Sequence, residues 1–279
     1  MIKHIRIFFI VSIIIGCNTK NSDKCEYCNN LEEKNNKYYC KTNNNLYSGK
    51  CYSFYSNAEK KDEYNFENGE ISGMYQMWYE NSQLRIKGNY YKSKKTGKWT
   101  HLYPDGKLKI ENNYRNNRKD SICLRYSSEG KISHKDNYKN GVQHGKCLEY
   151  FLDGKLWYEK HYKNGMLETL TEWYSTGQKK SEQRYKNENL HGKCTYWYKN
   201  GKVNYYYHYK NGIKNGEGFF RKENGETEKG NYYGDVRIGT WTEFNKVGFR
   251  IVGEYKNGRK FGTWTIYDER NFIINKKKY

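Results

Sequence analysis

Hydrophobic and aromatic residues recur along this chain with a long, nearly fixed period. A glycine or its substitute is followed two positions later by a packing residue and, in most copies, five positions later by an aromatic ring. The copies follow one another at steps of 23 or 24 residues without a gap, which predicts an array of ten tandem units. The units start at Gly49, Gly73, Gly97, Ser121, Gly145, Glu168, Gly192, Gly216, Gly239 and Gly262.

We expect each unit to bury the packing residue that stands two positions after its start. Aromatic rings and cysteines occupy this position in most units. The eighth unit instead carries Gly218 there, with Arg221 and Lys222 at later packing positions, so we expect it to be the weakest of the array. The packing residues are Cys51, Tyr75, Trp99, Cys123, Cys147, Leu170, Cys194, Gly218, Trp241 and Trp264.

Alternation of apolar and polar residues predicts β-strands within each unit. Residues 108–114 and 203–209 place mostly apolar or aromatic side chains at every second position. Asp105-Gly106 predicts a turn inside a unit and Asn140-Gly141 a turn at its end, because Asp or Asn before Gly tolerates positive φ. Each unit is therefore a β-hairpin. We expect an all-β fold, an elongated single antiparallel meander sheet of about ten tandem hairpins, on the order of 95 Å long.

The composition indicates what holds such a thin sheet together. Only about one residue in six is Leu, Ile, Val or Phe, and the formal net charge is +20, a combination that usually indicates disorder. The 31 Tyr, 7 Trp and 11 Phe argue against disorder, because rings cover much surface and stack on their counterparts in the next unit. A mean hydropathy of −1.21 excludes a multispanning membrane protein.

The reiterated pattern Tyr-x-Asn-Gly, then Gly-Lys-Trp or Gly-Lys-Cys, resembles the variant MORN repeat over residues 46–270. The clearest copies run from Tyr90 to Gly106, from Tyr185 to Gly201 and from Tyr255 to Tyr267. Proteins built of this repeat are commonly grouped as YwqK-family, antitoxin-like proteins, and many are bacterial lipoproteins. The resemblance implies a β-hairpin array and no catalytic residues, since the positions that the family shares are structural.

The N-terminus has the form of a bacterial secretory signal. Lys3 and Arg6 precede a short apolar run from Ile7 to Ile15, which is followed directly by Gly16-Cys17. This junction resembles a lipobox, so we expect residues 1–16 to be a lipoprotein signal peptide and Cys17 to carry the lipid. The alternatives are an uncleaved anchor and a mispredicted start. A lipid-anchored chain would lie outside the cytoplasm, in the cell envelope.

Two short segments flank the predicted array. Residues 17–45 are rich in Asn and Lys and are expected to be a lipidated linker, and residues 271–279 a C-terminal tail. The linker contains Cys25, Cys28 and Cys40, and a disulfide from one of the first two to Cys40 would leave an odd thiol. Zinc is the alternative, but no second close cysteine pair follows.

Four further cysteines occupy the packing position that holds Trp99, Trp241 and Trp264. Equivalent strands of adjacent hairpins lie about 9.6 Å apart, beyond the roughly 7 Å that a disulfide spans. We therefore expect them to be reduced, small packing residues. They are Cys51, Cys123, Cys147 and Cys194.

No constellation of catalytic or metal-ligating residues stands out. His144 and His191 share one repeat position, just before a unit start, and are expected to be turn residues. Glu149, Glu172 and Glu243 recur at another position, as expected of a solvated strand face. We therefore expect no enzyme activity, no cofactor and no metal site.

The positive charge indicates either an anionic partner or a soluble surface that protects the sheet. Lysine recurs at turn positions along the whole array rather than in one cleft, and we expect no nucleic acid partner for an exported chain. These lysines are Lys98, Lys107, Lys146, Lys155, Lys193 and Lys202.

Together these features predict a lipid-anchored, extracytoplasmic repeat scaffold that binds a protein or an anionic envelope component without catalysis. The alternative is an immunity or antitoxin-like protein that neutralises a toxin at the cell envelope.

Overall fold

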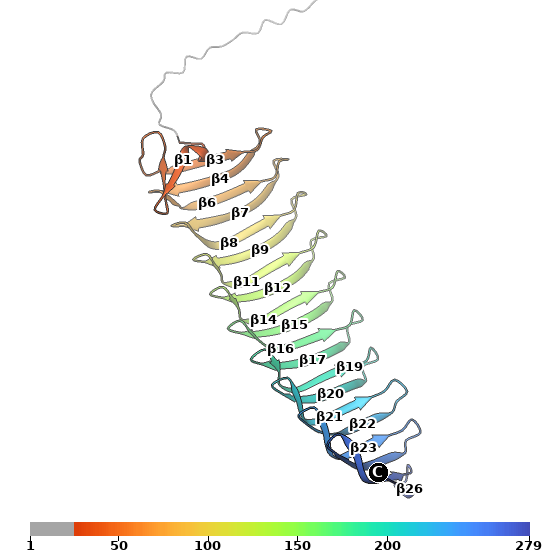
Figure 1. Cartoon of the computed structure of the whole chain (residues 1–279). Coiled ribbons are helices and arrows are strands. Elements are labelled where there is room, and N and C mark those ends of the chain that lie inside the picture. The colour runs from red at the N-terminus through yellow and green to blue at the C-terminus, as the bar shows by residue number, and fades with distance from the viewer. Residues whose placement is uncertain (1–24) are drawn as a thin grey trace, which may run out of the picture.

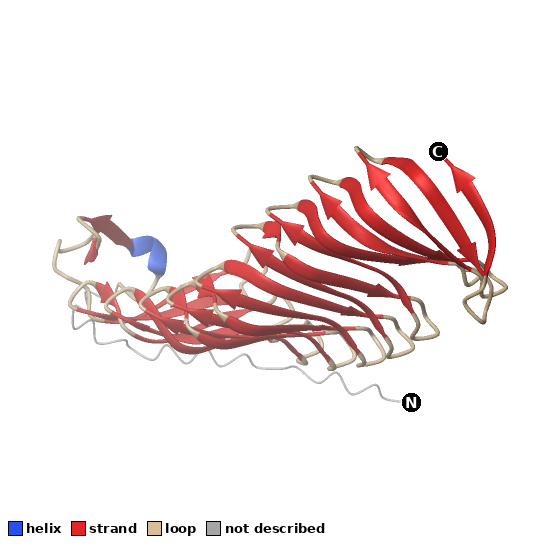
Figure 2. Ribbon diagram, turned by 90° about the horizontal axis from the view of Figure 1, so that it is seen from below, coloured by secondary structure: helices blue, strands red, loops and turns tan. Residues whose placement is uncertain are grey.

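A computed structural model describes residues 25–279, which form a long, single-layered and twisted β-sheet with a small cap at its N-terminal end (Figures 1 and 2). The expected signal peptide, residues 1–16, and Cys17 lie outside the described residues. The cap holds the 3-10 turn η1 (Cys28–Asn30) and the two-stranded sheet of β1 (Leu31–Lys34) and β2 (Lys37–Cys40). Within residues 25–279, no helix has the length and apolar character that crossing a membrane requires.

The long sheet contains strands β3 to β26 in chain order. Four of them, β5, β10, β13 and β18, are two-residue segments separated by one residue from the strand that follows. The strands are β3 (Gly49–Phe54), β4 (Lys60–Glu67), β5 (Glu70–Ile71), β6 (Gly73–Trp78), β7 (Leu84–Tyr91), β8 (Lys94–Leu102), β9 (Leu108–Arg115), β10 (Arg118–Lys119), β11 (Ser121–Tyr126), β12 (Ile132–Lys139), β13 (Val142–Gln143), β14 (Gly145–Tyr150), β15 (Leu156–Lys163), β16 (Met166–Trp173), β17 (Lys179–Lys186), β18 (Asn189–Leu190), β19 (Gly192–Trp197), β20 (Val203–Lys210), β21 (Ile213–Arg221), β22 (Thr227–Tyr233), β23 (Val236–Phe244), β24 (Arg250–Lys256), β25 (Arg259–Tyr267) and β26 (Ile273–Lys278).

The topology confirms the predicted antiparallel meander. Each strand pairs with the next one in the chain, except that each two-residue segment and the strand after it both pair with the strand before them. Within the described residues no pairing joins β3 to β26, so the sheet is open (Figure 1). The expected tail is the exception: β26 pairs with β25 and is the last strand of the sheet. Lys276, Lys277 and Lys278 line this open edge, where charge discourages the addition of another strand.

From the second unit on, each unit begins at a bulge. In the third unit, Gly97 to Trp99 lie opposite the single residue Gly88, so the bulged strand carries two extra residues. The backbone φ is positive at nine of the ten unit starts, which explains why glycine recurs there. Glu168 lacks a positive φ because its bulge carries one extra residue instead of two.

Two different turns join the strands. The first turn of a unit ends on one residue of positive φ, as at Gly106, and the side chain before it accepts a backbone hydrogen bond, as Asp105 does from Lys107 at 3.1 Å. The second turn has positive φ at two successive residues, as at Asn140 and Gly141, which is the type I′ geometry. Because all first turns lie along one side of the sheet and all second turns along the other, we name these sides the first-turn margin and the second-turn margin.

Hydrogen bonds between neighbouring units tie both margins. On the second-turn margin, the N–H of Gly141 donates to the carbonyl of Lys119 in the preceding hairpin, and Gly165 donates to Gln143 in the same way, each at 2.8 Å. On the first-turn margin, tyrosine hydroxyls donate to a carbonyl 23 residues further on. The donors are Tyr55, Tyr79, Tyr103, Tyr174 and Tyr198.

The packing residues lie on one face of the sheet, which we call the ring face. Trp99 is 1% exposed, and its indole lies over Gly88 of the preceding strand: a Cβ at Gly88 would come within 2.2 Å of the ring. Gly230 meets Trp241 and Gly253 meets Trp264 in the same way. A tryptophan in the bulge is thus accommodated by a glycine eleven residues earlier.

Cysteine replaces tryptophan where the preceding strand carries a larger residue. Asn112, Asp136 and Gln183 stand eleven residues before Cys123, Cys147 and Cys194, which are buried and reduced. Burial raises the pKa of these three thiols, which lowers their reactivity.

The number of cysteines that react with an alkylating reagent tests the burial of these thiols and the two disulfides. We expect the native chain to resist alkylation at Cys123, Cys147 and Cys194, and the denatured, unreduced chain to accept three labels between residues 25 and 279. Reduction before labelling should raise the count to seven, because two disulfides open. Intact mass spectrometry measures both numbers, and rapid labelling of the native chain would contradict the burial.

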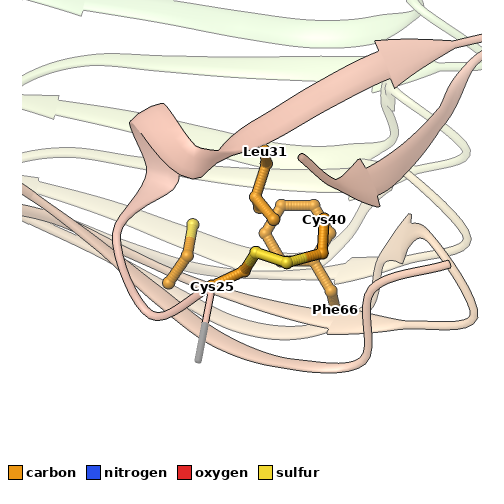
Figure 3. Close-up of a cluster of buried hydrophobic side chains, with 5 residues drawn as sticks. Cys25, Leu31, Cys40 and Phe66 are labelled. Atoms are coloured by element: carbon orange, nitrogen blue, oxygen red, sulfur yellow. A yellow bond between two sulfur atoms is a disulfide. The ribbon is translucent and has the colours of Figure 1, made fainter. Parts of the chain in front are cut away.

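The N-terminal cap corrects three sequence-based expectations. Residues 25–45 are folded rather than a linker, and Cys25 is disulfide-bonded to Cys40 beside Leu31 and Phe66 (Figure 3). No odd thiol is left in the cap, because Cys28 is disulfide-bonded to Cys51. Cys51 is therefore not a reduced packing residue: the cap places Cys28 on the ring face next to it, which the repeat spacing alone does not reveal.

The cap also covers the first edge strand. Tyr27 forms a parallel bridge with Tyr52 of β3, where the N–H of Tyr52 donates to the carbonyl of Glu26 at 2.8 Å. Tyr38 packs its ring against Phe66 with the centroids 5.0 Å apart. The cap thus covers an edge on which a foreign strand could otherwise add.

Candidate binding surfaces

The two ends of the ring face are covered by their own cations. Lys95 lies 4.3 Å above the ring of Trp99, Arg237 lies 4.3 Å above Trp241 and Lys260 lies 3.7 Å above Trp264. Burial lowers the pKa of Lys95. These cations cover the rings and offer little free charge to a partner.

Ion pairs occupy the middle of the ring face. Glu149 pairs with Lys160 at 2.5 Å, and Glu172 pairs with Lys180 at 2.8 Å. Glu243, further along, pairs with Lys260 at 3.0 Å. The expectation that these glutamates lie on a solvated face is therefore wrong: they lie on the packed face, where partly buried carboxylates require a cation.

Three of the six lysines that the sequence placed in turns lie in strands instead: Lys98 in β8, Lys146 in β14 and Lys193 in β19. Four of the six are neutralised by neighbouring acids. Two of these pairs join neighbouring strands and two lie within a turn, all at 2.7 to 3.0 Å. A fifth lysine, Lys193, lies 3.9 Å above the ring of Tyr206. The pairs are Lys98 with Glu111, Lys107 with Asp105, Lys146 with Glu159, and Lys155 with Asp153.

A different set of lysines is exposed and free of acids. In the fourth to seventh units the second turn begins with lysine, and within the described residues none of these four forms an ion pair. Each of them is the lysine of a Tyr-Lys-Asn motif, so the repeat pattern alone could have identified them. Other lysines were selected in the sequence analysis. The four are Lys139, Lys163, Lys186 and Lys210.

These four lysines form a row along the second-turn margin, which we call the lysine row. Equivalent positions in successive hairpins are separated by two strand spacings, about 9.6 Å. The only acid in the four turns is Glu188. Exposed apolar side chains stand directly opposite three of the lysines, since Val142, Met166 and Ile213 are 46 to 48% exposed. The margin therefore presents a linear series of positive charges.

The opposite face of the sheet carries an aromatic patch in the seventh and eighth units, which we call the ring platform. Tyr206 and Phe219 stack with their centroids 5.5 Å apart and their planes at 16°. The hydroxyl of Tyr206 donates to Glu217, and Lys193 lies over the Tyr206 ring. This pair lies in the seventh and eighth units, where the chain departs most from its own repeat.

The remaining predicted positions form no reactive centre. His144 and His191 lie at the interruption before a bulge and not in a turn, with the Nδ1 of His144 accepting from the N–H of Asn164 at 3.3 Å. His161 and Glu159 are 2.9 Å apart on the face opposite the ring face. Across residues 25–279, no group of three His, Cys, Asp or Glu side chains is placed to hold a metal ion.

The hairpin unit described above agrees with a known repeat. Five segments match the family model of the MORN repeat variant. Each matched segment spans one hairpin together with its turns, and the structure extends the same geometry to the units that the model does not match. The matched segments are residues 71–92, 95–116, 143–164, 169–187 and 190–211.

No curated protein sequence matches the chain. Among solved structures, it is similar at 10% identity to one titled "Crystal Structure of TcdB2-TccC3-TEV", with a TM-score of 0.19. That match covers 88% of this chain but only 16% of the other. BamB from Moraxella catarrhalis is also 10% identical, with 89% of this chain and 87% of that chain covered and a TM-score of 0.17. TM-scores this low do not establish a shared fold.

Proposed function

We propose that the chain is a lipid-anchored, extracytoplasmic repeat scaffold that binds an anionic component of the cell envelope through the lysine row. The proposal rests on a difference in pairing between the lysine row and the lysines that the sequence analysis selected. Lys98, Lys107, Lys146 and Lys155 are neutralised within the chain, whereas the lysines of the row have no acid partner in the described residues. Only the lysine row therefore offers unpaired positive charge to a partner.

The repeat geometry suits a linear or planar anionic partner. A row of equivalent cations lets many weak contacts act together, and such binding weakens as salt screens the charges. The scaffold would catalyse nothing, and it would need no cofactor. This combination fits a protein that holds envelope components together.

Titration of the purified mature chain with dextran sulfate, and with neutral dextran as the control, tests this proposal. We expect binding of the sulfated polymer alone, with affinity falling steeply as added salt shortens the screening length from about 10 Å to about 3 Å. Equal binding of neutral dextran, or affinity that ignores salt, would reject the anionic partner.

The membrane anchor is a separate part of the proposal, and it rests on the Gly16-Cys17 junction. We expect Cys17→Ala to release the chain from the membrane fraction, because the thiol that carries the lipid is removed. Fractionation of cells labelled with a fatty acid measures this. A variant that remains labelled and membrane-bound would refute the lipid anchor at Cys17.

A protein partner, as the immunity hypothesis requires, is the second candidate. The ring platform favours it, because stacked aromatic rings beside a cation are typical of hot spots in protein interfaces. A partner of this kind would bind at one place on the array. Loss of its binding on Phe219→Ala, with unchanged binding after replacement of the lysine row, would distinguish it.

A further inference from the structure

A hollow of about 480 Å³ opens on the first-turn margin where the seventh and eighth units meet. Its wall is built from two tyrosines, Tyr174 and Tyr198, and from turn residues that are mostly exposed, so it is open to solvent. The volume lies within the range of small-molecule sites. The hollow lies on the opposite margin from the lysine row and does not depend on the proposed function.

The hollow forms where the tyrosine hydrogen bonds of this margin end. Tyr174 donates to the carbonyl of Trp197 at 2.9 Å, and Tyr198 donates to that of Arg221 at 2.7 Å. The equivalent position of the eighth unit is Lys222, whose side chain pairs with Glu226 at 2.7 Å instead of reaching the next unit. The series of tyrosine hydrogen bonds therefore ends at the eighth unit, whose first turn forms one wall of the hollow.

A second kind of hydrogen bond between units is absent at the hollow itself. In the third to fifth units, the lysine after the first turn donates to a carbonyl of the next turn: Lys107 to Ser128, Lys131 to Leu152 and Lys155 to Ser175, at 3.1 to 3.3 Å. Lys202 is the equivalent lysine of the seventh unit, and within the described residues it forms no such bond. Its ammonium group is available at the wall of the hollow.

The charge of the wall is positive. Lys199, Lys202, Arg221 and Lys222 line the hollow with a single acid, Glu223. The Nε atom of Arg221 is buried without a hydrogen-bond partner in the described part of the chain. The guanidinium of Arg221 lies 5.5 Å from the ring centroid of Phe219, and the ammonium group of Lys202 has no acid partner in the described residues. A guanidinium and an unpaired lysine at one wall are the chemistry that binds a carboxylate.

We propose that this hollow binds an acidic sugar, a saccharide residue that carries a carboxylate. Arg221 and Lys202 would pair with the carboxylate, and the flat, amphipathic rings of Tyr174 and Tyr198 would pack against the sugar ring. An aliphatic anion would make no contact with the tyrosine rings, and a neutral sugar would leave the ammonium group of Lys202 without an anionic partner.

Calorimetric titration of the mature chain with trigalacturonate tests the proposal, with a neutral galactose trimer as the control. We expect trigalacturonate alone to bind, and Arg221→Gln together with Lys202→Gln to weaken its binding at least about tenfold, the loss of roughly one charge-assisted hydrogen bond. Lys155→Gln, at the equivalent but already bonded position, should leave the affinity unchanged.

The proposal would be overturned if millimolar trigalacturonate gave no heat of binding or if the neutral trimer bound equally well. It would also be overturned if the double variant kept the wild-type affinity, or if a triglutamate peptide bound more tightly than trigalacturonate. The last would assign the hollow to an acidic peptide. Lys202→Gln alone provides a check on folding, because this exposed side chain bonds to nothing in the described structure. Replacement of the lysine row should not change trigalacturonate binding, so this test and that of the scaffold function fail separately.

Discussion

Replacement of Trp99 by alanine should lower the free energy of unfolding around the third unit by about 3 to 5 kcal/mol. Trp99 is fully buried, contacts the rings of Tyr75, Tyr90 and Tyr114, and donates from Nε1 to the carbonyl of Asn89 at 3.1 Å. A thin sheet has no second layer that could collapse into the space. Because a repeat array opens locally, hydrogen exchange of β7 to β9 is the suitable measurement. Unchanged protection there would contradict the packing.

The contact between Gly88 and the Trp99 indole can also be tested from the glycine side. Gly88→Ala should cost about 1 to 3 kcal/mol, because its Cβ would overlap the Trp99 indole. Adding Trp99→Cys should recover part of this loss, since a cysteine stands over a larger residue in other units. A double-mutant cycle by hydrogen exchange should therefore give a favourable coupling of about 1 kcal/mol or more. Simple additivity of the two changes would show that ring and glycine do not contact.

Replacement of the lysine row by glutamine should weaken dextran sulfate binding about 100- to 1,000-fold at low salt. The estimate takes up to about 1 kcal/mol for each lysine close to an anionic surface and about 1.4 kcal/mol for each factor of ten. The variant is Lys139→Gln, Lys163→Gln, Lys186→Gln and Lys210→Gln.

The matched control removes the same number of charges from paired positions. Lys98→Gln, Lys107→Gln, Lys146→Gln and Lys155→Gln should change the affinity less than about threefold, because these ammonium groups already face acids. Equal losses in the two variants would mean that net charge, and not the lysine row, determines binding.

The sequence predicted the repeat, the hairpins and the meander because each depends on local signals. Unit length, turn residues such as Asn140-Gly141, and strand alternation are all read within a few positions. Two further signals were present and not used: the glycine eleven residues before each buried tryptophan of the third, ninth and tenth units, and the acid thirteen residues after Lys50, Lys98 and Lys146. Both depend on strand register, which the bulges set.

The N-terminal cap and the charge distribution could not be predicted in this way. The disulfide of Cys28 with Cys51 depends on how residues 25–45 fold back over the first hairpin, and cysteine spacing alone leaves the pairing open. Whether a lysine is free or paired likewise depends on its neighbour across the sheet. The hollow beside Arg221 depends on side-chain contacts between units, although the sequence did indicate that the eighth unit is irregular.

Lysine footprinting in intact envelopes tests the scaffold function most directly. Envelopes that carry the wild-type chain, and the purified mature chain alone, are treated briefly with an acetylating reagent, and the modified lysines are quantified by mass spectrometry. We predict that the envelope protects Lys139, Lys163, Lys186 and Lys210 together, and that protection disappears when high salt is added before the reagent. Protection confined to Lys193 and the neighbouring units, or no protection of the lysine row, would contradict the account.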